Sequence, residues 1–255
     1  MLHHLRSKKV LSVLLLPIFL TACAMFETGE AKLKRVKTIS VISVMGDELS
    51  FTRSGLNGMD NLSQHYSIKS WKLDDAIVKQ AGALIGTHFQ VQPLAYDPEL
   101  FYSHFEKDSP ITPLNLIRDD PLKQLLRTQA QQQSPDAYVV IVKAESTIGP
   151  SNRTVEGVGV VKYDALFGSC VQIHALYEIR VYDGHTLDLV EKRPAAPLDN
   201  GSVTKLAGPS RIVDESYMPS AGDPAQNEKL QAAIVSLIER SLQPTLGDLH
   251  LADLQ

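Results

Sequence analysis

Residues 171–182 read VQIHALYEIRVY, and apolar and polar side chains alternate along most of this segment. Successive side chains of a strand point to opposite faces, so a period of two predicts a strand with one face in the core. Asp183-Gly184-His185-Thr186 is typical of a turn, and 187–193 is predicted to return as a second strand. We therefore expect these segments to form an antiparallel sheet. The predicted inner face carries Val171, Ile173, Ala175, Tyr177, Ile179 and Val181, and the other face carries Gln172, His174, Glu178 and Arg180.

Other segments also have the composition of strands. Residues 38–45 are nearly continuously apolar and rich in β-branched residues, as a strand buried on both faces is. Residues 136–142 are the most strand-like run in the chain. Residues 49–53 are a candidate hairpin partner of the first, and 153–161 form a further candidate strand. Gly157 and Gly159 predict a bulge or close packing within it.

Helices are predicted where apolar residues recur at helical spacing after a capping residue. One begins at Leu73 and stops at Gly86, and two more follow the Asp-Pro pairs at 97–98 and 120–121. The last follows Asp223-Pro224 and is expected to end at Pro244. Its predicted inner stripe is Leu230, Ile234, Leu237, Ile238 and Leu242.

The order of these elements predicts the fold class. A strand or hairpin is followed by helices, a strand, an antiparallel set of strands and a helix. This order favours an α+β fold, a single layered domain over 38–250 with a mostly antiparallel sheet and helices packed on one face. Residues 194–224 hold five prolines and three glycines without apolar periodicity, so a long loop is expected there.

The N-terminal residues have the pattern of a secretory signal peptide. Arg6, Lys8 and Lys9 precede an apolar run of about ten residues, which is too short for the roughly 20 apolar residues of a membrane span. Leu20-Thr21-Ala22-Cys23 then resembles the lipobox of bacterial lipoproteins. The resemblance implies cleavage after residue 22, lipid on the sulfur of Cys23 and an acylated amine. An ordinary secretion signal with a chance cysteine is the alternative.

The lipobox resemblance also implies a location. Ala24 stands where aspartate would imply retention in the inner membrane, so the expected location is the bacterial envelope, lipid-anchored at the outer membrane and facing the periplasm. Several acyl chains would hold the protein firmly, since one chain alone binds only marginally. Residues 23–37 are polar and mixed in charge, and they predict a lipidated tether, with a first helix as the alternative.

Charge and cysteine content narrow the possible partners. Removal of residues 1–22 would change the formal charge from −4 to −7, which argues against nucleic acid or an anionic lipid surface as an electrostatic partner. The cysteines are Cys23 and Cys170, so a lipidated Cys23 leaves no intramolecular disulfide. The expected partners are the membrane, through the anchor, and another envelope protein; the oligomeric state is left open.

Two segments suggest a second resemblance. PDAYVVIVKAES at 135–146 and IHALYEIRVYDGHTLDLVEKR at 173–193 are similar to segments of the TolB N-terminal-like fold. That fold recurs in envelope lipoproteins, including the curli-secretion lipoprotein. The resemblance would span about 38–243, and it implies a fold and a location but no functional residue.

No catalytic, metal or cofactor motif stands out. Cys170 and His174 would lie about 13 Å apart on one strand, too far to chelate one zinc ion, so we expect a buried cysteine and a surface histidine. Ser202-Val203-Thr204-Lys205 matches a serine–lysine nucleophile motif but lies in the predicted loop. Asp74-Asp75 and Asp119-Asp120 are explained by capping at helix starts, with catalysis as the alternative.

Two segments are candidate partner surfaces because aromatic residues and arginine often anchor interfaces. One is the aromatic cluster Tyr96, Phe101, Tyr102 and Phe105, and the other carries Arg211, Tyr217 and Met218. The alternative is that the aromatic residues fix a loop to the sheet.

The sequence therefore favours a non-enzymatic, membrane-anchored envelope lipoprotein that serves as a binding or accessory module for another envelope protein. Two alternatives stay open: a periplasmic hydrolase acting on cell wall or lipid, and a subunit of an oligomeric secretion complex.

Overall fold

The computed structural model describes residues 29–55, 61–105, 121–129, 134–148, 153–165, 168–198, 206–218 and 223–253. The chain forms two compact units, residues 1–35 and 36–255. The described part of the first unit contains helix α2 (Gly29–Leu33), and Lys34, which follows it, forms an exposed ion pair with Glu30. A helical turn thus lies within the segment 23–37 that the sequence predicts as a tether. The signal peptide and Cys23 lie outside the described residues.

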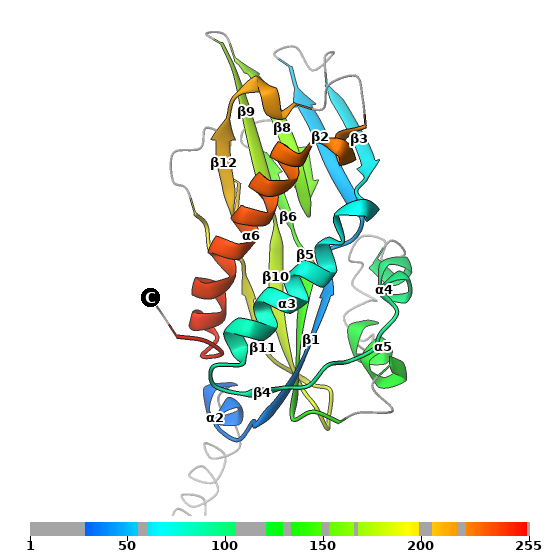
Figure 1. The fold of residues 1–255 in the computed structure, drawn as a ribbon, viewed down its shortest axis with the longest axis vertical. Coiled ribbons are helices and arrows are strands. Elements are labelled where there is room, and N and C mark those ends of the chain that lie inside the picture. The colour runs from blue at the N-terminus through cyan, green and yellow to red at the C-terminus, as the bar shows by residue number, and fades with distance from the viewer. Residues whose placement is uncertain are drawn as a thin grey trace, which may run out of the picture. The chain divides into compact units, whose positions relative to one another are not determined.

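The second unit contains two five-stranded sheets, which we call sheet A and sheet B (Figure 1). In sheet A the order is β11-β10-β5-β1-β4; β1 is parallel to β4 and β5, and β10 is antiparallel to β5 and β11. The strands of sheet A are β1 (Thr38–Val44), β4 (Gln90–Val91), β5 (Ala137–Lys143), β10 (Tyr177–Asp183) and β11 (Leu189–Pro194).

Sheet B has the order β12-β9-β8-β2-β3, in which β2 and β8 are parallel and the other neighbours are antiparallel. A separate hairpin pairs β6 (Glu145–Ile148) with β7 (Arg153–Glu156). The strands of sheet B are β2 (Glu48–Ser54), β3 (Leu62–Ser67), β8 (Val158–Ala165), β9 (Gly168–Ala175) and β12 (Ser210–Val213).

The two sheets follow one another along the long axis because strands of one continue into the other (Figure 1). Residues 45–47 join β1 to β2, and Leu176 alone joins β9 to β10. Gly46 has φ +86°, a left-handed conformation that glycine adopts readily. At this residue the chain continues from sheet A into sheet B instead of reversing its direction. The prediction that 49–53 forms a hairpin with β1 is therefore wrong, since β2 pairs with β3 and β8.

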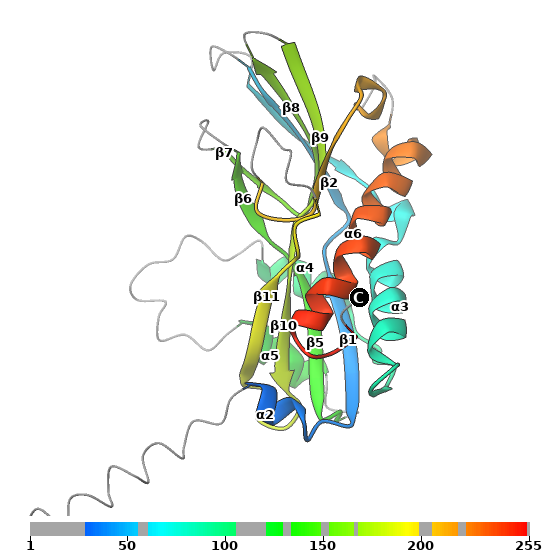
Figure 2. The same cartoon turned by 90° about the vertical axis from the view of Figure 1, so that its left-hand side faces the viewer.

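The helices lie on both sides of sheet A. Helices α3 (Leu73–Ile85) and α6 (Glu228–Asp248) pack side by side on one face (Figures 1 and 2). Helix α3 packs on β1 of sheet A, and α6 contacts β11 of sheet A and β9 of sheet B. Helices α4 (Pro98–Phe105) and α5 (Pro121–Gln129) bury Phe101, Leu122 and Leu126 against the opposite face. The α+β class is confirmed, but helices are not confined to one face. Single turns of 3-10 helix occur at η1 (Lys69–Trp71), η5 (Glu215–Tyr217) and η6 (Pro224–Gln226).

The core of sheet A follows from the apolar sequences of its central strands. Residues 39–44 of β1 are all buried, which confirms the two-sided burial predicted for 38–45, and residues 137–142 of β5 are all buried as well. The core between this sheet and helices α4 and α5 consists of Ile42, Val44, Phe101, Leu122, Leu125, Leu126, Tyr138, Val140, Val142, Tyr182 and Leu187.

Three element boundaries differ from the sequence prediction. Gly157, at φ +56°, divides 153–161 into β7 and β8. The predicted loop at 194–224 contains β12, which pairs with β9, and η5. Helix α6 begins at Glu228, with Asn227 as its cap, and continues past Pro244 to Asp248. Proline in the last turn removes a single hydrogen bond, to the carbonyl of the exposed Arg240, so the helix tolerates it.

Candidate functional site

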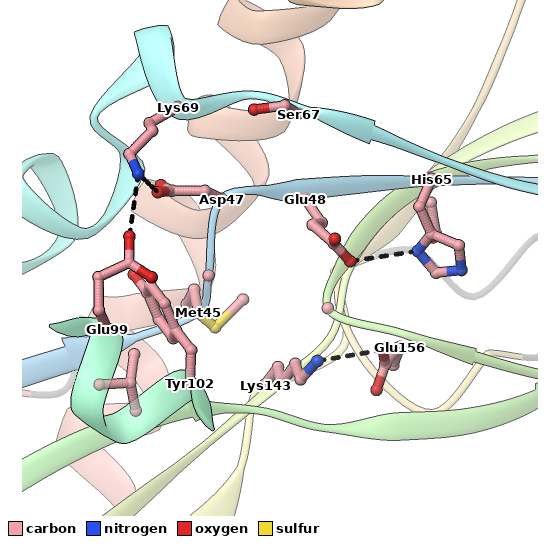
Figure 3. Close-up of a pocket in the computed structure, with 14 residues that line it drawn as sticks. Met45, Asp47, Glu48, His65, Ser67, Lys69, Glu99, Tyr102, Lys143 and Glu156 are labelled. Atoms are coloured by element: carbon pink, nitrogen blue, oxygen red, sulfur yellow. Dashed lines mark hydrogen bonds and ion pairs between the residues drawn. The ribbon is translucent and has the colours of Figure 1, made fainter. Parts of the chain in front are cut away.

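A pocket of about 230 Å³ opens where β1 passes into β2 (Figure 3). Its walls come from segments far apart in the sequence: the 44–48 connection, β2 and β3, η1, α4, and the strand ends at Lys143 and Glu156. Gly46 and Gly157 line it with left-handed backbone, so the chain turns at both positions without a side chain filling the space. The full lining is Val44, Met45, Gly46, Asp47, Glu48, Ser50, His65, Ser67, Lys69, Glu99, Tyr102, Lys143, Glu156 and Gly157.

The charged side chains of the pocket form ion pairs with one another (Figure 3). The Lys69 ammonium lies 2.9 Å from Glu99 Oε1 and 4.0 Å from Asp47 Oδ2. Lys143 Nζ lies 3.1 Å from Glu156 Oε1, and His65 Nδ1 lies 3.5 Å from Glu48 Oε2. Lys69 and Glu99 are 71% and 63% exposed, whereas Lys143 and Glu156 are 30% and 36% exposed. Exposed pairs are weak, so a ligand can exchange the Lys69–Glu99 pair for its own contacts.

Negative charge is in excess in this pocket. Four carboxylates face two lysines and one histidine. The pKa of Asp47 is raised by its partial burial and then by the nearby carboxylate of Asp74, while Lys69 opposes the rise. The pKa of Lys69 is raised because Glu99 accepts its hydrogen bond. Both shifts have the signs expected in a negative local field.

A buried hydrogen-bond network fixes the wall of the pocket next to α3. Asp74 is 8% exposed, and its Oδ1 accepts from Ser43 Oγ at 2.5 Å and from Met45 N at 2.8 Å. Its Oδ2 accepts from the Tyr102 hydroxyl, whose pKa is raised by burial and by this carboxylate. Of the predicted acidic pair, Asp74 therefore ties β1 and α4 to the start of α3, whereas Asp75 is exposed.

A polar row crosses sheet B next to the pocket. Ser50, Gly159 and His174 are register partners on β2, β8 and β9. A Cβ built on Gly159 would lie 2.1 Å from Ser50 Oγ and 2.6 Å from His174 Nε2, so these two atoms face each other across the glycine. His174 Nδ1 is 3.1 Å from the Gly157 carbonyl, and Nε2 is buried without a hydrogen-bond partner. The close packing predicted at Gly159 is confirmed.

The predicted surface position of His174 is wrong, because its exposure is 0%. It pairs with Ser210 of β12, a strand that forms within the predicted loop and covers this edge. Cys170 is half-buried on the same strand, and burial raises the pKa of its thiol. Among the described residues, no three His, Cys, Asp or Glu side chains are grouped as a metal ion would require.

The aromatic segment 96–105 serves mainly to hold its loop and helix on sheet A. Phe101 is fully buried, with its ring 5.8 Å from that of Tyr96 in an edge-to-face arrangement. The Tyr96 hydroxyl accepts from Ser43 N and donates to Ser43 O. Of the side chains of this set that the structure describes, those of Tyr96, Phe101 and Tyr102, only that of Tyr102 lines the pocket. Arg211, Tyr217 and Met218 are partly buried, and the Lys229 ammonium lies 4.1 Å from the ring centre of Tyr217.

Other residues singled out from the sequence are not in the described part of the chain. These are Cys23, Asp119-Asp120 and Ser202–Lys205. Apart from Tyr102 and the glycines, the pocket residues belong to no motif that the sequence analysis identifies. The sequence signal that could have indicated the pocket is the occurrence of charged residues beside a glycine, as at Gly46-Asp47-Glu48 and Glu156-Gly157.

Within the described residues, no helix combines the length and the apolar character needed to cross a bilayer.

Comparisons with known proteins give low similarity. No family model matches the sequence, and no curated protein matches it. The structure is similar to the crystal structure of lipoprotein GNA1162 from Neisseria meningitidis, at 10% identity and a TM-score of 0.26, over 80% of this chain and 96% of that one. It is also similar to the hypothetical protein CT253 from Chlamydia trachomatis, at 8% identity and a TM-score of 0.30, over 81% and 98% of the two chains. At these scores neither likeness assigns a fold or a function to this chain.

Proposed function

We propose that this protein is a lipid-anchored bacterial envelope protein that binds another envelope protein through the pocket at the β1–β2 junction. The carrying observation is the lining of that pocket, in which exposed ion pairs surround an apolar floor formed by Val44 and Met45. Such a lining offers exchangeable polar contacts around a small apolar centre, as protein interfaces do. The anchor rests on the lipobox-like residues up to Cys23, and the expected location is the outer membrane, facing the periplasm.

The binding role is tested by photo-crosslinking in living cells. A photoreactive residue replaces Ser67, which is exposed at the pocket. The matched control replaces Lys192, an exposed residue of β11 outside the pocket. We expect a discrete adduct with one protein from position 67 and none from position 192. Equal adducts from both positions, or none from either, would contradict the proposal.

The anchor has its own test. Intact-mass spectrometry of the purified protein should show a chain that begins at residue 23 and carries acyl groups. Cys23→Ser should release the protein from membranes without detergent. A native chain with a free thiol at position 23 would contradict the anchor but leave the pocket untouched.

A hydrolase is the second candidate, and the position of Ser50 across Gly159 from His174 favours it. Ser50 Oγ borders the pocket and donates to the Val158 carbonyl, and the unpartnered Nε2 of His174, a candidate base, faces it across the glycine. A fluorophosphonate probe should then label Ser50 in the full chain, and Ser50→Ala should abolish the label. Ser67→Ala, in the same pocket, is the control that should keep it. An unlabelled wild-type protein would contradict this candidate.

A further inference from the structure

We infer that the pocket receives a basic side chain of the partner protein, and that Lys69 occupies its place when the partner is absent. This inference rests on the proposed binding function and names the chemistry that the pocket selects. It depends on the charge balance, the position of Lys69, the shape of the cavity and its apolar walls.

The charge balance favours a cation. Lys143 is paired with Glu156, whereas Lys69 is shared between two carboxylates, those of Asp47 and Glu99. This side of the pocket therefore holds one more negative than positive charge, and Asp74 lies behind it. An ammonium or guanidinium group that takes the place of Lys69 would be attracted by both carboxylates, whereas an incoming carboxylate would add to the repulsion.

Lys69 already demonstrates where a cation is held. Its ammonium sits between Glu99 and Asp47, and Figure 3 shows it reaching toward both. The side chain is 71% exposed, so it can swing into solvent with little loss of packing. Exposed ion pairs contribute about 0.2–1 kcal/mol, and a better-buried cation from a partner can displace this one.

The dimensions and walls of the cavity fit a single long side chain. Its volume of about 230 Å³ is below the roughly 300–1,000 Å³ typical of small-molecule sites. Met45 and Tyr102 lie between the Lys69–Glu99 pair and the Lys143–Glu156 pair (Figure 3). A methylene stem can pack against these two side chains while its charged end reaches the carboxylates, and an aromatic ring adds attraction for a cation.

The experiment measures peptide binding to the full-length protein purified in detergent. The probes are acetyl-Gly-Arg-Gly-amide and the same peptide with glutamine or glutamate in place of arginine. Saturation-transfer NMR gives the dissociation constants. We expect binding of the arginine peptide only.

The variants give opposite signs, which a merely structural role would not produce. Lys69→Ala should tighten binding of the arginine peptide about two- to fivefold, because the competing cation is gone. Glu99→Gln should weaken it by a similar factor. Lys192→Ala, on β11, should leave it unchanged. Both pocket residues are exposed, so the variants are expected to fold, and urea unfolding checks this.

Weaker or unchanged binding in Lys69→Ala, or equal binding of the glutamate peptide, would overturn the inference. If either result is found while position 67 still gives a specific adduct in cells, the proposed binding function is retained and the basic side chain is rejected as the ligand. Loss of both the adduct and peptide binding would reject the two together.

Discussion

The central strands of the two sheets are built differently. In sheet A, β5 is apolar from Ala137 to Val142 and buried on both faces. In sheet B, the central strand β8 has a glycine at 159, and polar side chains meet across it. The buried polar residues of sheet B on this face are Ser50, Thr52, Ser54, Gln172, His174 and Ser210.

This difference has opposite consequences for the stability of the two sheets. Apolar burial on both faces of β5 favours the folded state, whereas buried polar groups oppose it unless they are hydrogen-bonded. Ser50 belongs to the polar row and also lines the pocket, so the less favourable packing lies beside the candidate site. The four predictions that follow test this contrast.

The largest effect is expected in sheet A. Ile141 of β5 is fully buried, and Ile141→Ala should lower the free energy of unfolding by about 2–5 kcal/mol, since the lost contacts leave a cavity. Urea unfolding at constant pH measures the change. Leu189→Ala in β11, where the leucine is 44% exposed, is the control and should stay within about 0.5 kcal/mol. Equal effects at both positions would contradict the two-sided burial of β5.

Sheet B should instead show a pH dependence. Burial lowers the pKa of His174 from 6.5 to about 4, because the imidazolium loses its hydration, and the Gly157 carbonyl opposes this only in part. Between these two values the unfolded chain binds more protons than the folded chain, so the free energy of unfolding falls as the pH falls. We expect this residue to account for a loss of about 2 kcal/mol between pH 7 and pH 5.

Two variants isolate this contribution. His174→Gln should remove it, whereas Ile141→Val should lower stability at every pH and keep the same pH dependence. The folded chain lowers the pKa values of Asp136 and Asp183, and these two carboxylates affect stability at lower pH, where carboxyl groups begin to protonate. The comparison therefore stops at pH 5. An unchanged pH dependence in His174→Gln would contradict the buried neutral state.

The close approach at Gly159 predicts a third effect. A Cβ there would lie 2.5 Å from the Ser50 carbonyl oxygen, a backbone atom that cannot easily move. Gly159→Ala should therefore cost about 1–3 kcal/mol of stability. The control, Gly82→Ala in α3, meets only Val91 at 3.6 Å and should raise stability by up to about 1 kcal/mol through helix propensity. Thermal unfolding compares the two, and the same sign in both would refute the packing described.

The smallest effect concerns the end of sheet A at which strands β1 and β5 begin. The Asp136 carboxylate accepts hydrogen bonds from Lys37 N, Thr38 N and Thr38 Oγ1, and these lower its pKa. Its stabilising contribution is present above the unfolded value of 3.8 and is lost as the pH falls through the lower folded value. Asp136→Asn should cost about 1 kcal/mol at neutral pH, measured by urea unfolding. A more stable variant would show that these bonds contribute nothing.

The sequence predicts the elements whose signal is local. The apolar run of β5 and the helical stripe from Leu230 to Leu242 each lie within one segment, so periodicity identifies them. The burial of His174 was missed because β12, formed from residues 210–213, pairs with its strand, and alternation along one strand says nothing of that neighbour.

The pocket was missed for the same reason. Asp47, Lys69, Glu99 and Glu156 come from four separate elements, and each by itself is an ordinary surface charge. Glu156 reaches the pocket because β2 pairs with β8 over a separation of more than a hundred residues, and Glu99 reaches it because α4 packs against β1. Tyr102 was identified from its aromatic neighbours, but its bond to Asp74 depends on the packing of α4 near α3.

The short passages from β1 into β2 and from β9 into β10 have a consequence for unfolding. Each sheet receives strands from the same two stretches of chain, joined by three residues in one case and by one residue in the other. When a strand detaches from sheet A, it pulls on a strand of sheet B through a link too short to absorb the movement. The two sheets should consequently melt in a single cooperative transition, in spite of their unequal packing.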